Sequence, residues 1–122
     1  MDDAIKQALE RDLTIDITTT GRKTGQPRRI EIWFHNLDGD LYLTGLPRPC
    51  SWYANLSAHP DFTFHLKESA QADLPSRATP VVDPVVRRDV IARIQKKLGR
   101  TGNDLEARVA GSPLMKVELQ LE

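Results

Sequence analysis

The stretch that decides the fold is residues 13–44, which read LTIDITTTGRKTGQPRRIEIWFHNLDGDLYLT. Apolar and polar residues alternate in three runs within it, which is typical of strands with one buried face. The three runs are residues 13–17, 30–34 and 41–43. Gly21 ends the first run, and Asp38-Gly39 is a strong signal for a two-residue hairpin turn between the second and third. Three strands joined by short turns predict an antiparallel sheet rather than parallel βαβ units.

Helices are expected where apolar residues recur at three- and four-residue spacing. Asp2 or Asp3 can cap a short helix at the start of the chain, and Ser51 can cap a second one. Asp83 before Pro84 is typical of the start of a longer helix. Beyond the first, the expected helical segments are about residues 51–58, 84–98 and 104–110. The residues expected to pack the longer helix on the sheet are Val86, Val90 and Ile94.

Further alternation predicts strands in the second half of the chain. These runs are residues 62–66, 70–74, 77–81 and 115–121. Pro75 and Pro80 cannot donate to a sheet ladder, so we expect them at edges or bulges between two separate strands. His35 and His65 occupy the polar positions of their runs and are expected to face solvent. A sheet of six or seven antiparallel strands closes most economically into a barrel, so the fold class is α+β in a single domain of residues 1–122.

Length and composition are those of an ordinary globular domain. The chain has 122 residues, of which 39% are hydrophobic and 28% charged, and its formal net charge is zero. No apolar run approaches the roughly 20 residues of a membrane helix, so no membrane insertion is expected. The chain starts with Asp2 and Asp3 rather than with a cationic and apolar leader, which favours a cytoplasmic location. The three histidines and Cys50 have no metal-ligand spacing, and we expect no metal site.

The segment between the first two strands is the most basic part of this neutral chain. It holds four cations within eight residues and no carboxylate between them. These are Arg22, Lys23, Arg28 and Arg29. Gly21 and Gly25 allow the backbone to turn with positive φ and to expose its N–H groups. Guanidinium forks, an ammonium group and free backbone donors together are what phosphate and carboxylate ligands require. From this stretch alone, an anion site and a solvated hairpin remain equally good interpretations.

A Trp-Tyr pair follows the proline-rich loop of residues 45–49. Trp52 and Tyr53 can wall a pocket for a planar ligand, or Trp52 can plug the end of the barrel as a core residue. Neither a GxSxG elbow nor another local arrangement of nucleophile and base is present, so hydrolase chemistry is not indicated. A nucleic-acid-binding barrel would need a longer basic stripe with interleaved aromatic residues, and aromatic residues make up only 6% of the chain.

Two separated motifs then resemble a known family. TTTGRKTGQPRR at residues 18–29, and the turn LDGDLYL followed by SWYANLSAHPDFTFHL at residues 51–66, resemble the deazaflavin-dependent nitroreductases, also described as F-420-dependent quinone reductases. The resemblance implies a split β-barrel of the flavin-binding superfamily. It also implies that coenzyme F-420 binds with its phosphate and glutamate tail on the basic loop and its ring between the barrel and the short Trp-Tyr helix. The loop GLPRPCS is shorter here than is usual for this family.

The resemblance also assigns roles to individual residues. By position, it implies that Arg22, Lys23 and Arg28 bind the anionic tail and that the backbone of Thr44 and Gly45 approaches the ring. The residues that it implies shape the ring pocket are Trp52, Tyr53 and Asn55. Because a hydride carrier brings its own reactive centre, the protein has to supply position and at most one proton or hydrogen-bond donor. Tyr53 is the preferred donor, and Tyr42 is the reserve.

These observations predict an F-420-dependent oxidoreductase that transfers a hydride between the reduced cofactor and a small organic acceptor such as a quinone, nitro or enone compound. Two alternatives stay open. One is an FMN-dependent oxidoreductase of the same superfamily, and the other is a non-catalytic carrier of F-420 or of another planar or lipidic ligand. The expected partners are small molecules and not nucleic acid, and a homodimer is left open.

Overall fold

The computed structural model describes residues 2–99 and 104–120 and contains six strands and four helices. The strands are β1 (Thr14–Thr20), β2 (Pro27–Leu37), β3 (Asp40–Thr44), β4 (Asp61–Leu66), β5 (Ala72–Pro80) and β6 (Leu114–Leu119). They close into a barrel in the order β1-β2-β3-β6-β5-β4, and every neighbouring pair is antiparallel. The predicted α+β class and antiparallel barrel are therefore confirmed.

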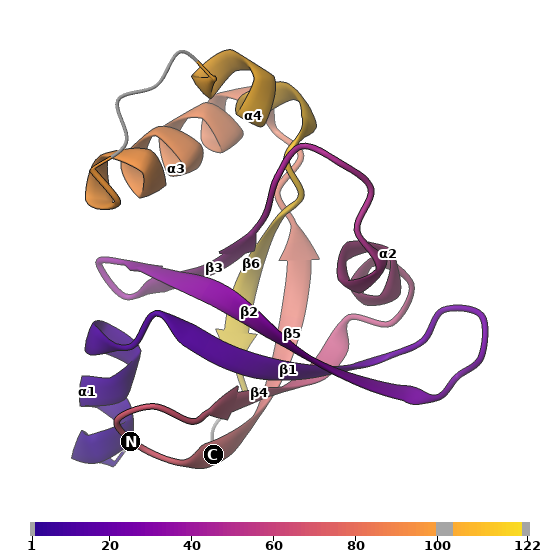
Figure 1. Cartoon of the computed structure of the whole chain (residues 1–122), viewed down its shortest axis with the longest axis vertical. Helices are drawn as coiled ribbons and strands as arrows, with labels where there is room; N and C mark the ends of the chain where they lie inside the picture. The colour runs from indigo at the N-terminus through magenta and orange to yellow at the C-terminus, as the bar shows by residue number, and fades with distance from the viewer. Residues whose placement is uncertain (1, 100–103, 121–122) are drawn as a thin grey trace.

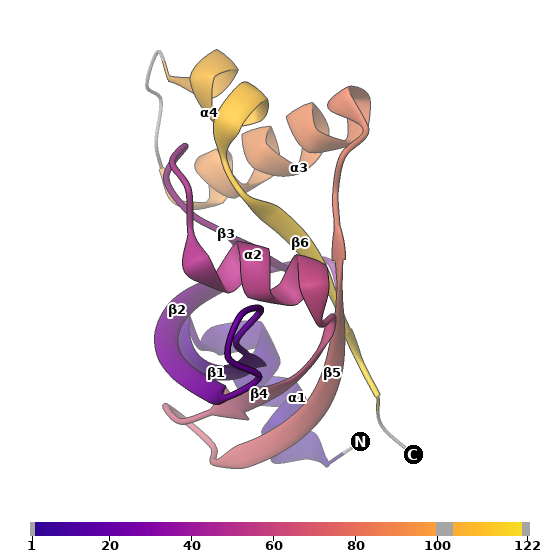
Figure 2. The same cartoon turned by 90° about the vertical axis from the view of Figure 1, so that its right-hand side faces the viewer.

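The helices cover the ends and one side of the barrel (Figure 1). They are α1 (Asp3–Arg11), α2 (Ser51–Ala58), α3 (Pro84–Lys97) and α4 (Leu105–Gly111). In Figure 1, α1 lies at the lower end, α3 and α4 lie together at the upper end, and α2 lies beside the barrel. Figure 2 shows α2 lying across the barrel on the side where the β1–β2 loop emerges. No described helix is long and apolar enough to cross a membrane.

Local sequence signals explain where these elements begin and turn. The Asp2 carboxylate accepts a hydrogen bond from the Ala4 N–H at 2.7 Å, and the Asp83 carboxylate caps α3 by accepting from the Val85 N–H at 2.8 Å. The β2–β3 turn has positive φ at both central residues, 54° at Asp38 and 98° at Gly39. This is the geometry of the predicted two-residue hairpin turn.

Two apolar clusters hold the molecule together. The first fills the barrel, where the rings of Phe34 and Phe64 meet edge to face with their centroids 5.3 Å apart. The second lies outside the barrel, under α3, and consists of Leu37, Tyr42, Val90, Ile91, Ile94 and Leu114. The predicted packing of α3 through Val90 and Ile94 is confirmed. Val86 was wrongly predicted to join them: it is 45% exposed, and Ile91 is buried in its place.

The strand predictions need one further correction. The runs 70–74 and 77–81 are not two strands but parts of the single strand β5, which contains Pro75. The Pro75 carbonyl accepts a hydrogen bond from the Gln120 N–H at 2.8 Å, so its missing N–H also faces the β6 side. The paired register with β6 ends at Ser76, so the missing N–H falls at the end of the β5–β6 ladder and not within it. The last strand ends at Leu119, and Leu121 lies outside the described residues.

The prediction that both histidines face solvent is also wrong. His35 is 3% exposed and His65 is 7% exposed. Both lie on the outer face of the barrel, but α3 covers the part of that face around His35, and neighbouring strands surround His65. A further correction concerns α2, where the N-cap is Cys50 and not Ser51, and no side chain caps the helix.

Candidate functional site

The four-residue basic cluster predicted from the sequence opens onto a hollow, which we call the basic cavity. It has a volume of about 700 Å³ and lies between the β1–β2 loop and the segment that leads into α2. Four cationic side chains line it, together with Trp52 and Asn55. The cations are Arg22, Lys23, Arg28 and Arg48. The structure thus brings five of the predicted site residues together and adds Arg48 to them.

The cations of the basic cavity are available to a ligand. All four are exposed, and within residues 2–99 and 104–120 none of them forms an ion pair. Arg29, the fourth member of the sequence cluster, behaves differently. Its Nε donates to the Asp16 carboxylate at 3.0 Å on the outer face of the barrel. The unpaired guanidinium and ammonium groups form the kind of donor set that binds phosphate and carboxylate.

The two glycines give the basic loop its shape. The Gly21 N–H donates to the Gln26 carbonyl, and the Gly25 N–H donates to the Gly21 carbonyl, both at 2.8 Å. A Cβ at Gly21 would lie only 2.7 Å from the Thr24 hydroxyl oxygen, and Gly25 has a φ of 69°, which favours glycine. The loop is therefore folded on itself through its own backbone hydrogen bonds.

Asn55 fastens this loop to α2. Its side-chain carbonyl accepts a hydrogen bond from the Arg22 N–H at 3.0 Å, and its amide group donates to the Thr19 hydroxyl at 3.4 Å. The side chain is buried although it lines the basic cavity. Asn55 thus positions Arg22, and its polar atoms are already engaged by protein groups.

Trp52 serves both of the roles that the sequence left open. It packs partly buried against the apolar cluster inside the barrel, meets the Tyr53 ring edge to face, and also walls the basic cavity. Tyr53 lines a neighbouring hollow that shares Arg48 with the basic cavity. The reserve donor Tyr42 is buried in the cluster under α3 and lines none of these hollows. The structure therefore does not bring the predicted donor into the basic cavity.

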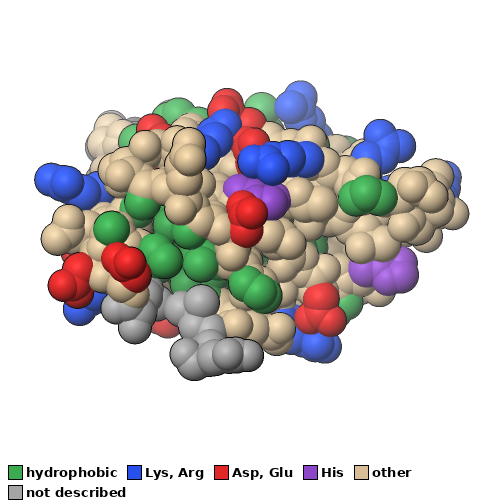
Figure 3. Space-filling model, turned by 90° about the horizontal axis from the view of Figure 1, so that it is seen from below, with side chains coloured by type: hydrophobic (Ala, Val, Ile, Leu, Met, Phe, Trp, Pro, Cys, Tyr) green, Lys and Arg blue, Asp and Glu red, His purple; other side chains and the backbone are tan. Residues whose placement is uncertain are grey.

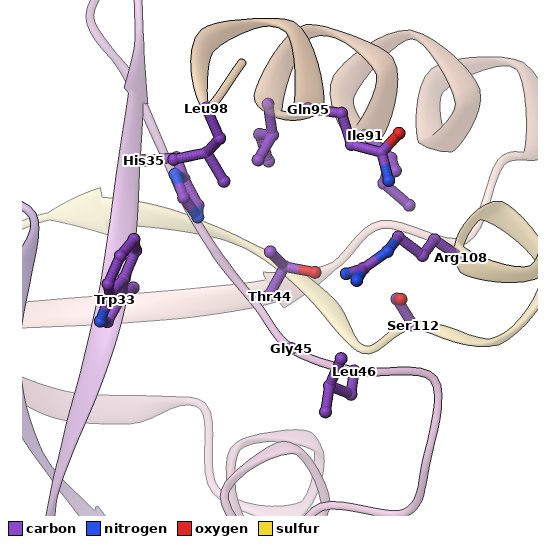
Figure 4. A pocket seen from close by; sticks show the side chains of 11 residues that line it. Trp33, His35, Thr44, Gly45, Leu46, Ile91, Gln95, Leu98, Arg108 and Ser112 are labelled. Atoms are coloured by element: carbon purple, nitrogen blue, oxygen red, sulfur yellow. The ribbon is translucent and has the colours of Figure 1, made fainter. Parts of the chain in front are cut away.

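Thr44 and Gly45 line a second hollow, which we call the small cavity. It has a volume of about 190 Å³ and lies between β2 and β3 on one side and α3 and α4 on the other (Figure 4). The Thr44 hydroxyl is engaged, because it donates to the Pro113 carbonyl at 2.6 Å. A Cβ at Gly45 would lie 3.9 Å from Cζ2 of Trp52, which lines the basic cavity. Gly45, which lines the small cavity, therefore lies near Trp52, which lines the basic cavity.

Sequence reasoning missed Arg48 and the whole polar side of the small cavity. Arg48 lies between Pro47 and Pro49, in the loop that leads directly to the Trp-Tyr pair. A cation at this position could have been predicted to belong to the same site. Arg108 and Ser112 gave no such signal, because they come from the end of the chain and meet Thr44 only in the folded protein.

One cluster outside the cavities has the outline of a hydrolase triad. The Thr18 hydroxyl lies 2.7 Å from Nε2 of His65, and Nδ1 of His65 lies 2.6 Å from the Asp73 carboxylate. This arrangement comes from three strands, which is why no local motif revealed it. The strand that carries Thr18 is paired on both sides, so its backbone N–H groups are used in the sheet and cannot form an oxyanion hole. We interpret the cluster as structural.

The shifted carboxyl pKa values near this cluster have local causes. A hydrogen bond from Lys67, and then one from Arg29, lowers the pKa of Asp16 below its ordinary value. Lys67 also pairs with Glu31, and the hydrogen bond from His65 lowers the pKa of Asp73. Figure 3, which shows the end of the molecule opposite α3 and α4, has side chains of both signs interspersed. These shifts belong to surface ion pairs rather than to either cavity.

Comparison with known proteins identifies the family. The model of the family described as F420H(2)-dependent quinone reductase matches residues 3–85, more than half of the chain. The chain belongs to this family. An F420H(2)-dependent quinone reductase of Mycobacterium tuberculosis is 48% identical over 48 residues, which cover 35% of this chain and 32% of the relative. The chain thus spans about a third of the length of the curated relatives that it matches.

Solved structures show that the family's split-barrel fold extends over the whole chain. A structure described as an F420 reductase has a TM-score of 0.70 at 20% identity and covers 95% of this chain and 93% of its own. HutZ, a heme storage protein of Vibrio cholerae, has a TM-score of 0.71 at 15% identity, with 99% of this chain and 91% of its own covered. At such identities the likeness establishes the fold, which different ligand-binding proteins share.

Proposed function

We propose that this chain is an F-420-dependent oxidoreductase that transfers a hydride between the reduced cofactor and a small organic acceptor such as a quinone, nitro or enone compound. One observation carries the proposal: four cations that form no ion pair with any described residue share one cavity with the Trp52 ring, in a chain of the F420H(2)-dependent quinone reductase family. The bound deazaflavin would supply the hydride chemistry, and the protein would supply position and electrostatics.

The residues of the basic cavity fit an anionic, partly planar cofactor. A phosphodiester and a glutamate tail need several cationic donors, and Arg22 and Lys23 provide them from the β1–β2 loop and Arg28 from the start of β2. Arg48 faces the same hollow from the opposite segment, so the cavity offers cations on both sides. Preformed donors lower the free-energy cost of ordering on binding, which favours tight recognition of an extended tail.

The remaining predicted residues have distinct roles in this proposal. Trp52 forms an apolar wall, and Asn55 holds the loop that carries Arg22 and Lys23. Gly45 lies near Trp52, so a ring that extends from the basic cavity past Trp52 would meet the backbone of Gly45 and Thr44. Tyr53 remains the candidate donor, because its hollow shares Arg48 with the basic cavity and Ser112 with the small cavity.

A cofactor titration tests the proposal. The full chain is titrated with purified F-420 and with FMN under identical conditions, and the oxidation of reduced F-420 is then followed with a quinone and with a nitroaromatic compound. We expect F-420 to bind more tightly than FMN, and its oxidation to depend on the protein. Tighter binding of FMN would favour the FMN enzyme, and tight F-420 binding without turnover would favour a carrier. Either result would contradict the proposed function.

A Tyr53→Phe variant separates binding from the donor role. If the Tyr53 hydroxyl gives a proton or a hydrogen bond to the acceptor, kcat falls while the Kd for F-420 stays the same. An unchanged kcat would remove Tyr53 from the mechanism.

A further inference from the structure

The small cavity combines apolar walls with a few polar side chains. Trp33 and Leu98 lie across the cavity from Arg108 and Ser112, and Leu46 lies near Ser112 (Figure 4). His35 and Gln95 add polar groups from β2 and α3. No Asp or Glu is among the described residues that line the cavity. A cavity with apolar walls and a few convergent polar groups is the usual form of a small-molecule site.

Ser112 carries a buried hydroxyl that the protein does not satisfy. The residue is 4% exposed, and its Oγ has no hydrogen-bond partner among the described residues. The backbone groups of Ser112 are engaged, because its N–H donates to the Arg108 carbonyl and its carbonyl accepts from Arg87. An unsatisfied buried hydroxyl lowers stability, and such groups are rare in native structures. Ser112 thus lines the cavity, and its buried hydroxyl is a donor that no described residue uses.

Arg108 places a fixed positive charge beside that hydroxyl. Its Nε donates to the Asp104 carboxylate at 2.6 Å, and the two terminal nitrogens of the guanidinium point into the cavity (Figure 4). The Asp104 side chain is 50% exposed and that of Arg108 only 17%, so solvent screens the carboxylate more strongly than the guanidinium. Asp104 also accepts from Gln95 at 3.3 Å. Asp104 therefore orients Arg108, and the cavity side of the pair is positive.

We propose that the small cavity binds a small monocarboxylic acid that carries one apolar ring. The carboxylate would meet the terminal nitrogens of Arg108 and the hydroxyl of Ser112, and the ring would lie between Trp33, Leu46 and α3. An apolar cavity of about 150 Å³ admits benzene, so a single ring fits a volume of about 190 Å³. The inference goes beyond the proposed function, because binding of the acid requires no cofactor.

Calorimetric titration of the full chain without cofactor tests the inference. The probes are benzoate, its uncharged isostere benzamide, and acetate, which has the charge without the ring. We expect benzoate to bind more tightly than either of the other two, because only benzoate uses both sides of the cavity. Equal binding of benzoate and benzamide would exclude a charged recognition group, and absence of benzoate binding would overturn the proposal. Neither result depends on F-420, so this titration tests the small cavity independently of the proposed function.

Matched variants show where benzoate binds. Arg108→Met is expected to weaken benzoate binding by about tenfold or more and to leave benzamide almost unaffected. Arg88→Met is the control, because Arg88 also pairs with a carboxylate of the α4 region, that of Glu106, but does not line the cavity. Equal benzoate affinity of the two variants would refute the site.

A second variant keeps the test valid if Arg108→Met fails to fold. Ser112→Ala removes an unsatisfied hydroxyl, so we expect its melting temperature to be unchanged or higher while its affinity for benzoate falls. Unchanged benzoate affinity in Ser112→Ala would show that this hydroxyl does not contact the acid and would contradict the proposed geometry.

Discussion

Two adjacent arginines give the sharpest test of the basic cavity. Arg28 and Arg29 follow one another in β2, where successive side chains point to opposite faces. Arg28 lines the basic cavity, whereas Arg29 pairs with Asp16 on the outer face. Arg28→Ala and Arg29→Ala therefore remove the same charge from neighbouring positions, and only the first removes a proposed cofactor contact.

The two substitutions are expected to change the affinity for F-420 by very different amounts. A hydrogen bond to a charged group is worth about 1.5–3 kcal/mol, and about 1.4 kcal/mol corresponds to a tenfold change in affinity. Arg28 is exposed, which favours the lower end of this range. We therefore expect Arg28→Ala to weaken F-420 binding by about tenfold and up to about a hundredfold. Arg29→Ala should change the affinity for F-420 by less than about threefold. Arg29 lies outside the basic cavity, so salt screens its interaction with a cofactor bound there.

The assay is a titration of each variant with F-420, with melting temperatures measured in parallel. Both variants should melt close to the native protein, because an exposed ion pair such as Arg29–Asp16 contributes at most about 1 kcal/mol. A cofactor with a shortened glutamate tail completes a double-mutant cycle, since a residue that meets the tail gives non-additive losses. If Arg28→Ala and Arg29→Ala bind full-length F-420 equally well, the assignment of the basic cavity as the tail site is wrong.

Three further predictions concern the anchor of the basic loop, the hydrogen bonds of a half-buried arginine and a surface ion pair. Asn55→Ala removes the acceptor of the Arg22 N–H, so amide exchange in the basic loop should accelerate and F-420 binding should weaken; unchanged exchange would contradict the anchoring role. Arg87 donates to three backbone carbonyls, and Arg87→Met should lower the free energy of unfolding by about 2–4 kcal/mol in urea denaturation. Lys67 lowers the pKa of Asp16, so the stability from Asp16 is present above about pH 4 and is lost below it. Asp16→Asn should therefore show a shallower loss of melting temperature on acidification than the native protein.

Most of the barrel was predictable because its signals are local. The alternation around Ile15 and Ile17, and the Asp38-Gly39 turn, each depend on a few consecutive residues, and both segments adopt the predicted structure. Asp83 followed by Pro84 determined the start of α3 in the same way. The period of the apolar residues and the turn residues were therefore sufficient to predict the fold class.

The errors at His65, Val86 and Pro75 share one physical cause, which is that burial and strand pairing depend on distant segments. His65 has the polar position in its strand, yet Thr18 and Asp73 from two other strands hydrogen-bond to it. Val86 has the right helical spacing, but α3 packs with Ile91 inward instead. A single strand containing Pro75 was read as two, because the point where β6 stops pairing cannot be seen in the sequence of β5.

For the same reason, more of the basic cavity than of the small cavity could be predicted from the sequence. The basic cavity depends mainly on a single loop, so its cations stood out as a cluster in the sequence, and Arg48 was missed because it comes from another segment. The small cavity combines strand, loop and helix residues that are up to about eighty positions apart, such as Trp33 and Ser112. Each of these residues is unremarkable in its own segment. What marks Ser112 is that its buried hydroxyl has no partner among the described residues, a property that exists only once α4 has packed against the barrel.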